Sequence, residues 1–161
     1  MDRIDRLSRR INAAAEILLA VLGGVMVLVV AAQVFCRYLL NHSLFWSEEL
    51  ARYLLVWLTF LGATVAYRRG LHPSVDFLYA RVASGVARMM RLASTLAAML
   101  LFGVMTVGGT QFAHFIRTQI SPALQVPKWT VMLVVPLSGA LLILHTLALS
   151  AKRPEGAPRD D

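Results

Sequence analysis

Four apolar stretches without a formally charged residue occupy more than half of this 161-residue chain: Ile17–Phe35, Tyr53–Tyr67, Leu92–Ile116 and Trp129–Ala151. A helix on the surface of a water-soluble domain keeps one polar face, whereas these stretches are apolar all round. About 20 helical residues cross the hydrocarbon core of a bilayer, and Leu50 and Ala51 extend the short second stretch to that length. The sequence therefore predicts an all-α integral membrane protein, a bundle of four transmembrane helices at about residues 14–36, 48–67, 92–116 and 128–150.

The distribution of charge predicts the orientation of these spans. The chain has 16 Lys and Arg against 9 Asp and Glu, a net charge of +7. Twelve of the sixteen cations precede span one, lie between spans two and three, or follow span four. Because cationic loops stay in the cytoplasm, we expect both termini there, with residues 152–161 as a disordered cytoplasmic tail. The basic excess then reflects topology, so we expect no nucleic-acid partner.

Two further segments have the pattern of amphipathic interfacial helices. At the N-terminus, Ile4, Leu7 and Ile11 share one helical face, with arginines on the other. We expect this helix to lie at the inner interface and to run into span one without a break. A second amphipathic pattern covers residues 75–91, between spans two and three. Both predict contacts with membrane lipids, because their arginines suit anionic headgroups.

Glu16 lies about one turn inside the inner boundary of span one, where an unpaired carboxylate is costly. It either bonds to the headgroups or a nearby arginine, or it contacts a partner helix. Both readings stay open at the level of the sequence.

Span two begins with a cluster of polar residues after Trp46, which suits an aromatic belt at the outer interface. Ser47 is expected to cap the helix, and Glu48 and Glu49 in the first turn complement its positive end. Arg52 has the spacing to pair with either glutamate. Local pairing accounts for these charges, but three of them within five residues also suit a contact between subunits.

Small residues and prolines predict how the helices pack. Three pairs with spacing of four residues permit close helix approach, within the chain or with a partner: Ala20 and Gly24, Gly62 and Ala66, and Gly109 and Ala113. Pro136 predicts a kink in span four. Gln33 and Gln111, near the outer ends of spans one and three, are expected to bond to each other.

The chain has no HExxH motif and no pair of carboxylates at mid-depth, so we expect no enzyme and no metal site. A haem subunit would need two histidines on facing helices. His114 and His145 lie at different depths, and His42 and His72 are in loops. An autonomous transporter would show polar residues at the midplane and several broken helices. We therefore expect neither a bound cofactor nor a substrate site in this chain.

Two motifs flank the first loop: Arg37-Tyr38-x-Leu40-Asn41 and Trp46-Ser47-Glu48-Glu49-Leu50-Ala51-Arg52. A second group follows in and after span two: Trp57, Phe60-Leu61-Gly62-Ala63, Ala66, Arg69, His72 and Val75-Asp76. This pattern, within about residues 16–78, resembles the small membrane subunit of tripartite ATP-independent periplasmic (TRAP) transporters of the DctQ/SiaQ type. Pro73 departs from it, since the family often has a β-branched residue there.

The resemblance implies a scaffold subunit of a sodium-coupled secondary importer in a bacterial inner membrane. A periplasmic binding protein would deliver an organic acid to a large multi-span subunit that holds the substrate and sodium sites. Partner contacts at the outer end would come from Arg37, Trp46, Glu48, Glu49 and Arg52. Arg69 and His72 would fix the inner loop, against Glu16 or Asp76. The alternative is a four-helix anchor or haem-binding subunit of a respiratory or other membrane complex.

Overall fold

The computed structural model describes residues 2–69 and 84–150. These residues form the helices α1 (Asp2–Tyr38), α2 (Ser47–Arg68), α4 (Ser84–Phe115), α5 (Lys128–Met132) and α6 (Val134–Ser150). Within the described part, the only β contact is an isolated bridge between Ile120 and Pro127. Four helical segments are long and apolar enough to cross a membrane: Ile4–Tyr38, Ser47–Arg68, Gly85–Phe115 and Lys128–Leu149. The prediction of an all-α protein with four membrane-spanning helices is confirmed.

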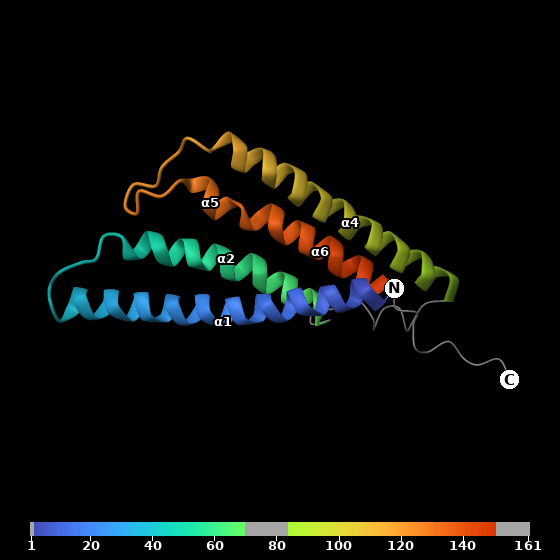
Figure 1. Cartoon of the computed structure of the whole chain (residues 1–161), viewed down its shortest axis with the longest axis horizontal. Helices are drawn as coiled ribbons and strands as arrows, with labels where there is room; N and C mark the ends of the chain where they lie inside the picture. The colour runs from blue at the N-terminus through green and yellow to red at the C-terminus, as the bar shows by residue number, and fades with distance from the viewer. Residues whose placement is uncertain (1, 70–83, 151–161) are drawn as a thin grey trace.

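The helices lie side by side in the order α1, α2, α6, α4, as a fan-shaped layer (Figure 1). α6 lies between α2 and α4, and α1 also reaches α6 where the fan is narrow. The bundle is therefore a layer and not a ring of helices around a central space. We call the end where α1 begins and α2 and α6 end the termini end. The opposite end, with the α1–α2 and α4–α5 connections, is the loop end.

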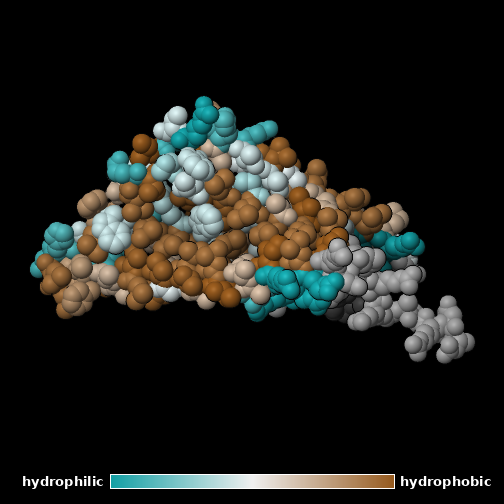
Figure 2. Space-filling model, in the orientation of Figure 1, coloured by the Kyte–Doolittle hydropathy of each residue, from teal (hydrophilic) through white to brown (hydrophobic). Residues whose placement is uncertain are grey.

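Burial is concentrated in the centre of the layer. Half of the most apolar part of the α5–α6 span is buried, whereas none of the corresponding part of α1 is. The exposed residues of α1 and α4 are mostly large and apolar, and include Leu28, Leu100 and Phe115. Figure 2 shows this apolar surface over the middle of the layer. Because lipid solvates apolar side chains, such edges fit a membrane protein.

Two glycines permit the close approach of α4 and α6. A Cβ atom on Gly139 would lie 2.6 Å from Thr106 Oγ1 and 2.9 Å from the Phe102 carbonyl oxygen. A Cβ atom on Gly109 would lie 2.9 Å from Cδ of Pro136. The predicted role of Gly109 is thus confirmed.

The glycines of the other two small-residue pairs do not have this role among the described residues. A Cβ atom on Gly24 or Gly62 would meet nothing within 4 Å. Within residues 2–69 and 84–150, these two glycines bring no helices together, because the space beside each of them is open.

The helix boundaries follow the proline and the amphipathic patterns. The span-four helix is interrupted at Leu133, three residues before Pro136, so the predicted distortion is confirmed. α1 runs from Asp2 to Tyr38 without a break, as expected. α4 begins at Ser84, so residues 84–91 of the second amphipathic pattern continue directly into span three. Residues 75–83 lie outside the described residues. The positions of the membrane boundaries stay predictions.

Candidate functional site

At the termini end, an ionic contact joins the start of α1 to the end of α2. Arg68 donates a hydrogen bond to Asp5, and Arg9 lies 2.7 Å from the other oxygen of the same carboxylate. The Arg68 side chain is only 8% exposed and that of Asp5 is 14% exposed. The pair is therefore half-buried between the two helices, unlike the usual solvated arginine of a membrane surface.

Glu16 is paired with Arg69 just after α2. Arg69 Nη2 lies 2.7 Å from Glu16 Oε2, and Arg69 Nε donates to Glu16 Oε1 at 2.9 Å. Asn12 Nδ2 donates to the same Oε1 at 2.6 Å. The expectation that Glu16 pairs with a nearby arginine, and that Arg69 bonds to Glu16, is confirmed. The predicted partners His72 and Asp76 lie outside the described residues.

A buried polar contact joins α1 to α6. Ser8 Oγ lies 2.8 Å from His145 Nδ1, and the two residues are 0% and 1% exposed. Beside it, Thr146 Oγ1 lies 3.0 Å from the hydroxyl of Tyr67 at the end of α2. Sequence reasoning missed this contact. The four-residue spacing of Ser8, Asn12 and Glu16 on α1 was the available signal, since it makes one polar stripe.

At the loop end, Glu49 fixes the α4–α5 connection to α2. The backbone N–H groups of Ala123 and Leu124 donate to its Oε2 at 2.8 Å and 2.9 Å. The Tyr53 hydroxyl donates to its Oε1 at 2.6 Å. The connection also has a residue in the left-handed region, since Gln125 has a φ of 55°. One carboxylate thus accepts three hydrogen bonds, and it forms no ion pair with a cation of the described residues.

The polar start of α2 differs from its prediction in three respects. Ser47 is not the cap: its hydroxyl donates to the Leu44 carbonyl at 2.6 Å, because Ser47 is already inside the helix. Gln33 does not bond to Gln111, and instead donates to Glu48 Oε1 at 3.2 Å across α1 and α2. Within the described chain, no ion pair joins Arg52 to Glu48 or Glu49. Both glutamates have other donors, so local pairing with Arg52 is wrong.

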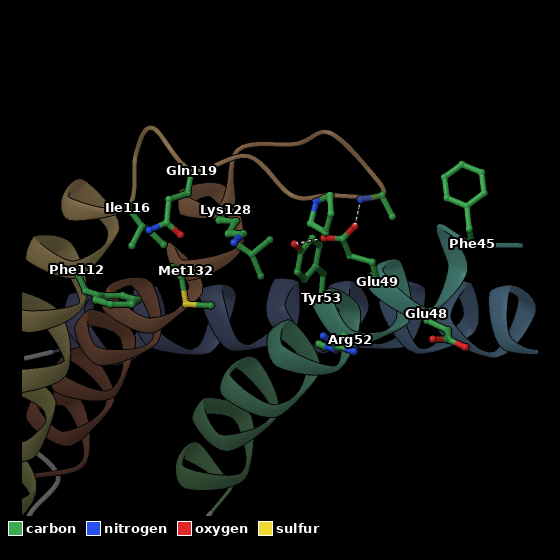
Figure 3. A pocket seen from close by; sticks show the side chains of 13 residues that line it. Phe45, Glu48, Glu49, Arg52, Tyr53, Phe112, Ile116, Gln119, Lys128 and Met132 are labelled. Carbon is green, nitrogen blue, oxygen red and sulfur yellow. Dashed lines mark hydrogen bonds between the residues drawn. The ribbon is translucent and has the colours of Figure 1, made fainter.

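A groove of about 530 Å³ opens at the loop end between α2, α4 and α5 (Figure 3). We call it the loop-end groove. Its charged lining residues are Glu48, Glu49, Arg52 and Lys128, and its apolar lining residues are Phe45, Phe112, Ile116, Pro122, Val131 and Met132. In Figure 3, Lys128 lies between Gln119 and Tyr53, and Arg52 lies below Glu49. The groove brings together three of the five predicted outer contact residues.

The other two predicted outer residues lie apart from this groove. Arg37 is exposed in the last turn of α1, and Trp46 is half-buried directly before α2. Neither lines the loop-end groove. Among the described residues, no group of three His, Cys, Asp or Glu side chains has the arrangement of a metal site. At both ends, the side chains can recognise another molecule through hydrogen bonds and charge.

Comparison with known proteins indicates the family of this chain. The model of the DctQ component of tripartite ATP-independent periplasmic transporters matches residues 26–153. The C4-dicarboxylate TRAP transporter small permease protein DctQ of Rhodobacter capsulatus is 29% identical over 122 residues, which are 74% of this chain and 54% of that protein. The sialic acid TRAP transporter small permease protein SiaQ of Vibrio cholerae is 30% identical over 111 residues, 69% of this chain and 64% of that one. The chain thus spans about half to two thirds of these relatives.

A third relative is much longer. The isethionate TRAP transporter permease protein DctMQ of Oleidesulfovibrio alaskensis is 29% identical over 107 residues, which are 63% of this chain but only 16% of that protein. These relatives are transport proteins and not enzymes, which confirms the expectation of a non-enzymatic membrane subunit. With the family model matching 26–153 and four helices able to span a bilayer, this multi-pass membrane protein belongs to the DctQ-component family of TRAP transporters, as a small permease subunit.

Proposed function

We propose that this chain is the scaffold subunit of a three-part, sodium-coupled importer of an organic acid, without a substrate site of its own. A large multi-span subunit would hold the substrate and the sodium ions. A periplasmic binding protein would deliver the substrate to it. The membrane would be the bacterial inner membrane, with both termini in the cytoplasm, so that the loop end faces the periplasm.

One observation carries this proposal: the four spans form a layer and not a ring. A solute path through a protein needs polar groups around a central space at mid-depth. A second groove, between α2, α4 and α6, is instead lined almost entirely by apolar side chains, among them Phe60, Leu101 and Met105. The layer therefore suits a support for another protein better than a carrier.

The exposed edges of the layer supply the surface for the large subunit. The most apolar part of α1 has no buried residue, and that of α4 is almost as exposed. The relative DctMQ carries the matching segment within one much longer permease protein. A physical link of that kind supports a lasting contact between this chain and a large permease subunit.

The names of the relatives support an organic-acid substrate, because they include C4-dicarboxylate and sialic acid transporters. The residues that select the substrate would lie in the other two proteins. The binding protein would approach the loop end, where the charged groove opens.

The test is reconstitution of this chain with its large subunit and the binding protein. Uptake of the solute that the binding protein retains should require all three proteins and a sodium gradient. Vesicles with this chain alone should take up nothing, and the chain should co-purify with the large subunit. Uptake of equal rate without this chain would refute the scaffold role.

A further inference from the structure

The second groove, between α2, α4 and α6, lies within the membrane-spanning part of the layer. Figure 1 shows α2 and α4 on either side of α6, and the groove between them has a volume of about 390 Å³. We call it the α2–α4 groove. α6 contributes Leu142, which is 5% exposed and forms the floor. The walls touch where Tyr67 of α2 and Phe102 of α4 meet edge to face, with ring centroids 5.5 Å apart.

The hydroxyl groups of this lining are already bonded within the chain. Thr59 Oγ1 donates to the Leu55 carbonyl at 2.8 Å, and the Tyr67 hydroxyl lies 3.0 Å from Thr146 Oγ1. The other described lining residues are alanines, leucines, phenylalanines and a methionine. A polar molecule would lose its hydration here and gain few hydrogen bonds, whereas hydrocarbon has none to lose. The occupant of the groove is therefore apolar.

The size of the groove excludes a transmembrane helix as the occupant. One turn of a helix, roughly 10 Å wide and 5.4 Å long, fills about 400 Å³, which is already the volume of the whole groove. The width of the groove comes from small side chains on both walls, Ala63 on α2 and Ala98 on α4. A single hydrocarbon chain is thin enough to lie between them.

The face of α4 that lines the groove leads to a cation. Ala98 and Arg91 are seven residues apart, which places them on one face of the helix and about 10 Å apart along its axis. Side chains of a helix point towards its N-terminus, so the exposed Arg91 extends further towards the termini end. A phosphate suits a guanidinium, because the two form charge-assisted hydrogen bonds. The groove and Arg91 together thus match the two parts of a phospholipid.

We propose that the α2–α4 groove holds one acyl chain of a phospholipid from the leaflet at the termini end, with the lipid phosphate at Arg91. The chain fills the space between α2 and α4, which both pack on α6. Because lipid tails are as apolar as the groove, the chain gains close packing rather than transfer from water. Attraction to Arg91 then favours an anionic headgroup, such as that of phosphatidylglycerol, over the zwitterionic headgroup of phosphatidylcholine. This inference needs only the four spans and does not depend on the proposed transport function.

The experiment places the full chain in vesicles of phosphatidylethanolamine and phosphatidylglycerol. A trace of the phosphatidylglycerol carries a photoreactive diazirine in one acyl chain, and mass spectrometry of peptides locates the adducts after illumination. We expect the adducts to concentrate on the two walls, at residues 60–63 and 98–105, in preference to the exposed faces of α1.

Variants that fill the groove should expel the chain. Ala98→Phe should lower the labelling of the α2 wall by about fivefold or more, because an overfilled site disfavours the chain. The matched control is Ala97→Phe at an exposed position of α4 that does not line the groove, and it should leave the labelling unchanged. Ala63→Leu fills the groove from the opposite wall and should lower the labelling of α4 in the same way, even if Ala98→Phe does not fold.

A second probe tests the headgroup. Phosphatidylcholine with the same diazirine chain should label the groove less than phosphatidylglycerol does, and Arg91→Gln should remove the difference. The control Arg88→Gln changes another exposed arginine at the start of α4 and should preserve the difference. Equal labelling by both probes in the unaltered protein would overturn the phosphate contact with Arg91.

Three further results would overturn the proposal. Labelling of the groove no stronger than that of α1 would mean that the groove meets only the bulk bilayer. An equal loss of labelling in Ala97→Phe would mean that the effect is not specific to the groove. The labelling is finally repeated with the large permease subunit bound: persistence supports the lipid, whereas loss from both walls would show that side chains of that subunit occupy the groove.

Discussion

The two ends of the helix layer satisfy their polar groups in different ways. At the termini end, Asp5 with Arg68, Ser8 with His145, and Glu16 with Arg69 each join two helices. At the loop end, one carboxylate holds a loop, and two cations in a groove have no partner in the described chain. The comparison teaches that polar groups at the termini end join helices to one another, whereas the loop end leaves two cations of its groove without a partner in the described chain.

The difference follows from where the polar groups are buried. A polar side chain away from water is costly unless it is paired, so the buried groups of the termini end need partners within the chain. Arg52 is exposed, so water can solvate its guanidinium and it needs no partner within the chain. Substitutions at the two ends should therefore act on different properties of the protein.

The largest effect on stability is expected for Asp5→Ala at the termini end. The variant leaves the Arg68 guanidinium, which is 8% exposed, without its carboxylate. Removal of one partner of a fully buried ion pair costs about 3–5 kcal/mol, and this half-buried pair should lose about the lower end of that range. Thermal unfolding in detergent should show a clearly lowered midpoint. The control Arg10→Ala, an exposed cation on the same helix, should change it little. Equal midpoints for the two variants would contradict a holding role for this end.

A smaller effect is expected for Ser8→Ala. The variant removes the hydroxyl that bonds to His145 Nδ1 and leaves that buried ring atom unsatisfied. An unsatisfied buried group costs about 1–3 kcal/mol. The same unfolding measurement should place this variant between Asp5→Ala and the unaltered protein. Ser43→Ala, an exposed serine of the α1–α2 connection, is the matched control. A stabilised Ser8→Ala variant would show that the contact with α6 is dispensable.

A local effect is expected for Glu49→Ala at the loop end. Without the carboxylate, the amides of Ala123 and Leu124 lose their acceptor, and the loop is no longer held to α2. Hydrogen exchange of these two amides should accelerate by about tenfold, while exchange in α6 stays the same. Glu49→Gln keeps an acceptor oxygen and should lie in between. Acceleration throughout α6 would mean that this carboxylate stabilises the whole layer.

The smallest effect is expected for Glu16→Gln. Its partner Arg69 is 55% exposed, and ion pairs at exposed positions contribute little to stability. The amide still accepts a hydrogen bond from the guanidinium. The unfolding midpoint should fall by less than in Ser8→Ala. A fall as large as that of Asp5→Ala would place the main ionic contact of the termini end at Glu16.

The spans and the pairing of Glu16 with a nearby arginine could be predicted because each follows from one local property, whereas Arg69 itself was indicated only by the family resemblance, with Asp76 as the other possible partner. Long apolar runs mark the membrane-spanning helices, and the depth of Glu16 beside the cationic boundary indicates its partner. Gly109 was recognised from its spacing to Ala113, although the same spacing at Gly24 and Gly62 leads to open sides. A spacing rule identifies a small residue but not the element that faces it.

The contacts of the candidate site could not be predicted in this way. Glu49 bonds to amides 74 and 75 residues later in the chain, and Ser8 bonds to His145 across 137 residues. Backbone amides carry no residue-specific signal, so nothing in the sequence marks them as partners of a glutamate. Arg52 has the spacing for an ion pair with Glu48, but Glu48 bonds to Gln33 because α1 lies beside α2.

The unbroken first helix has a consequence for the whole layer. With 37 residues, α1 is roughly 55 Å long, nearly twice the thickness of the hydrocarbon core. Such a rod either projects from the bilayer or crosses it at a slant. Since Asp5 and Ser8 bond its first turns to α2 and α6, any change in its slant must be shared by those two helices. The subunit should therefore respond to membranes of different thickness by tilting as one body.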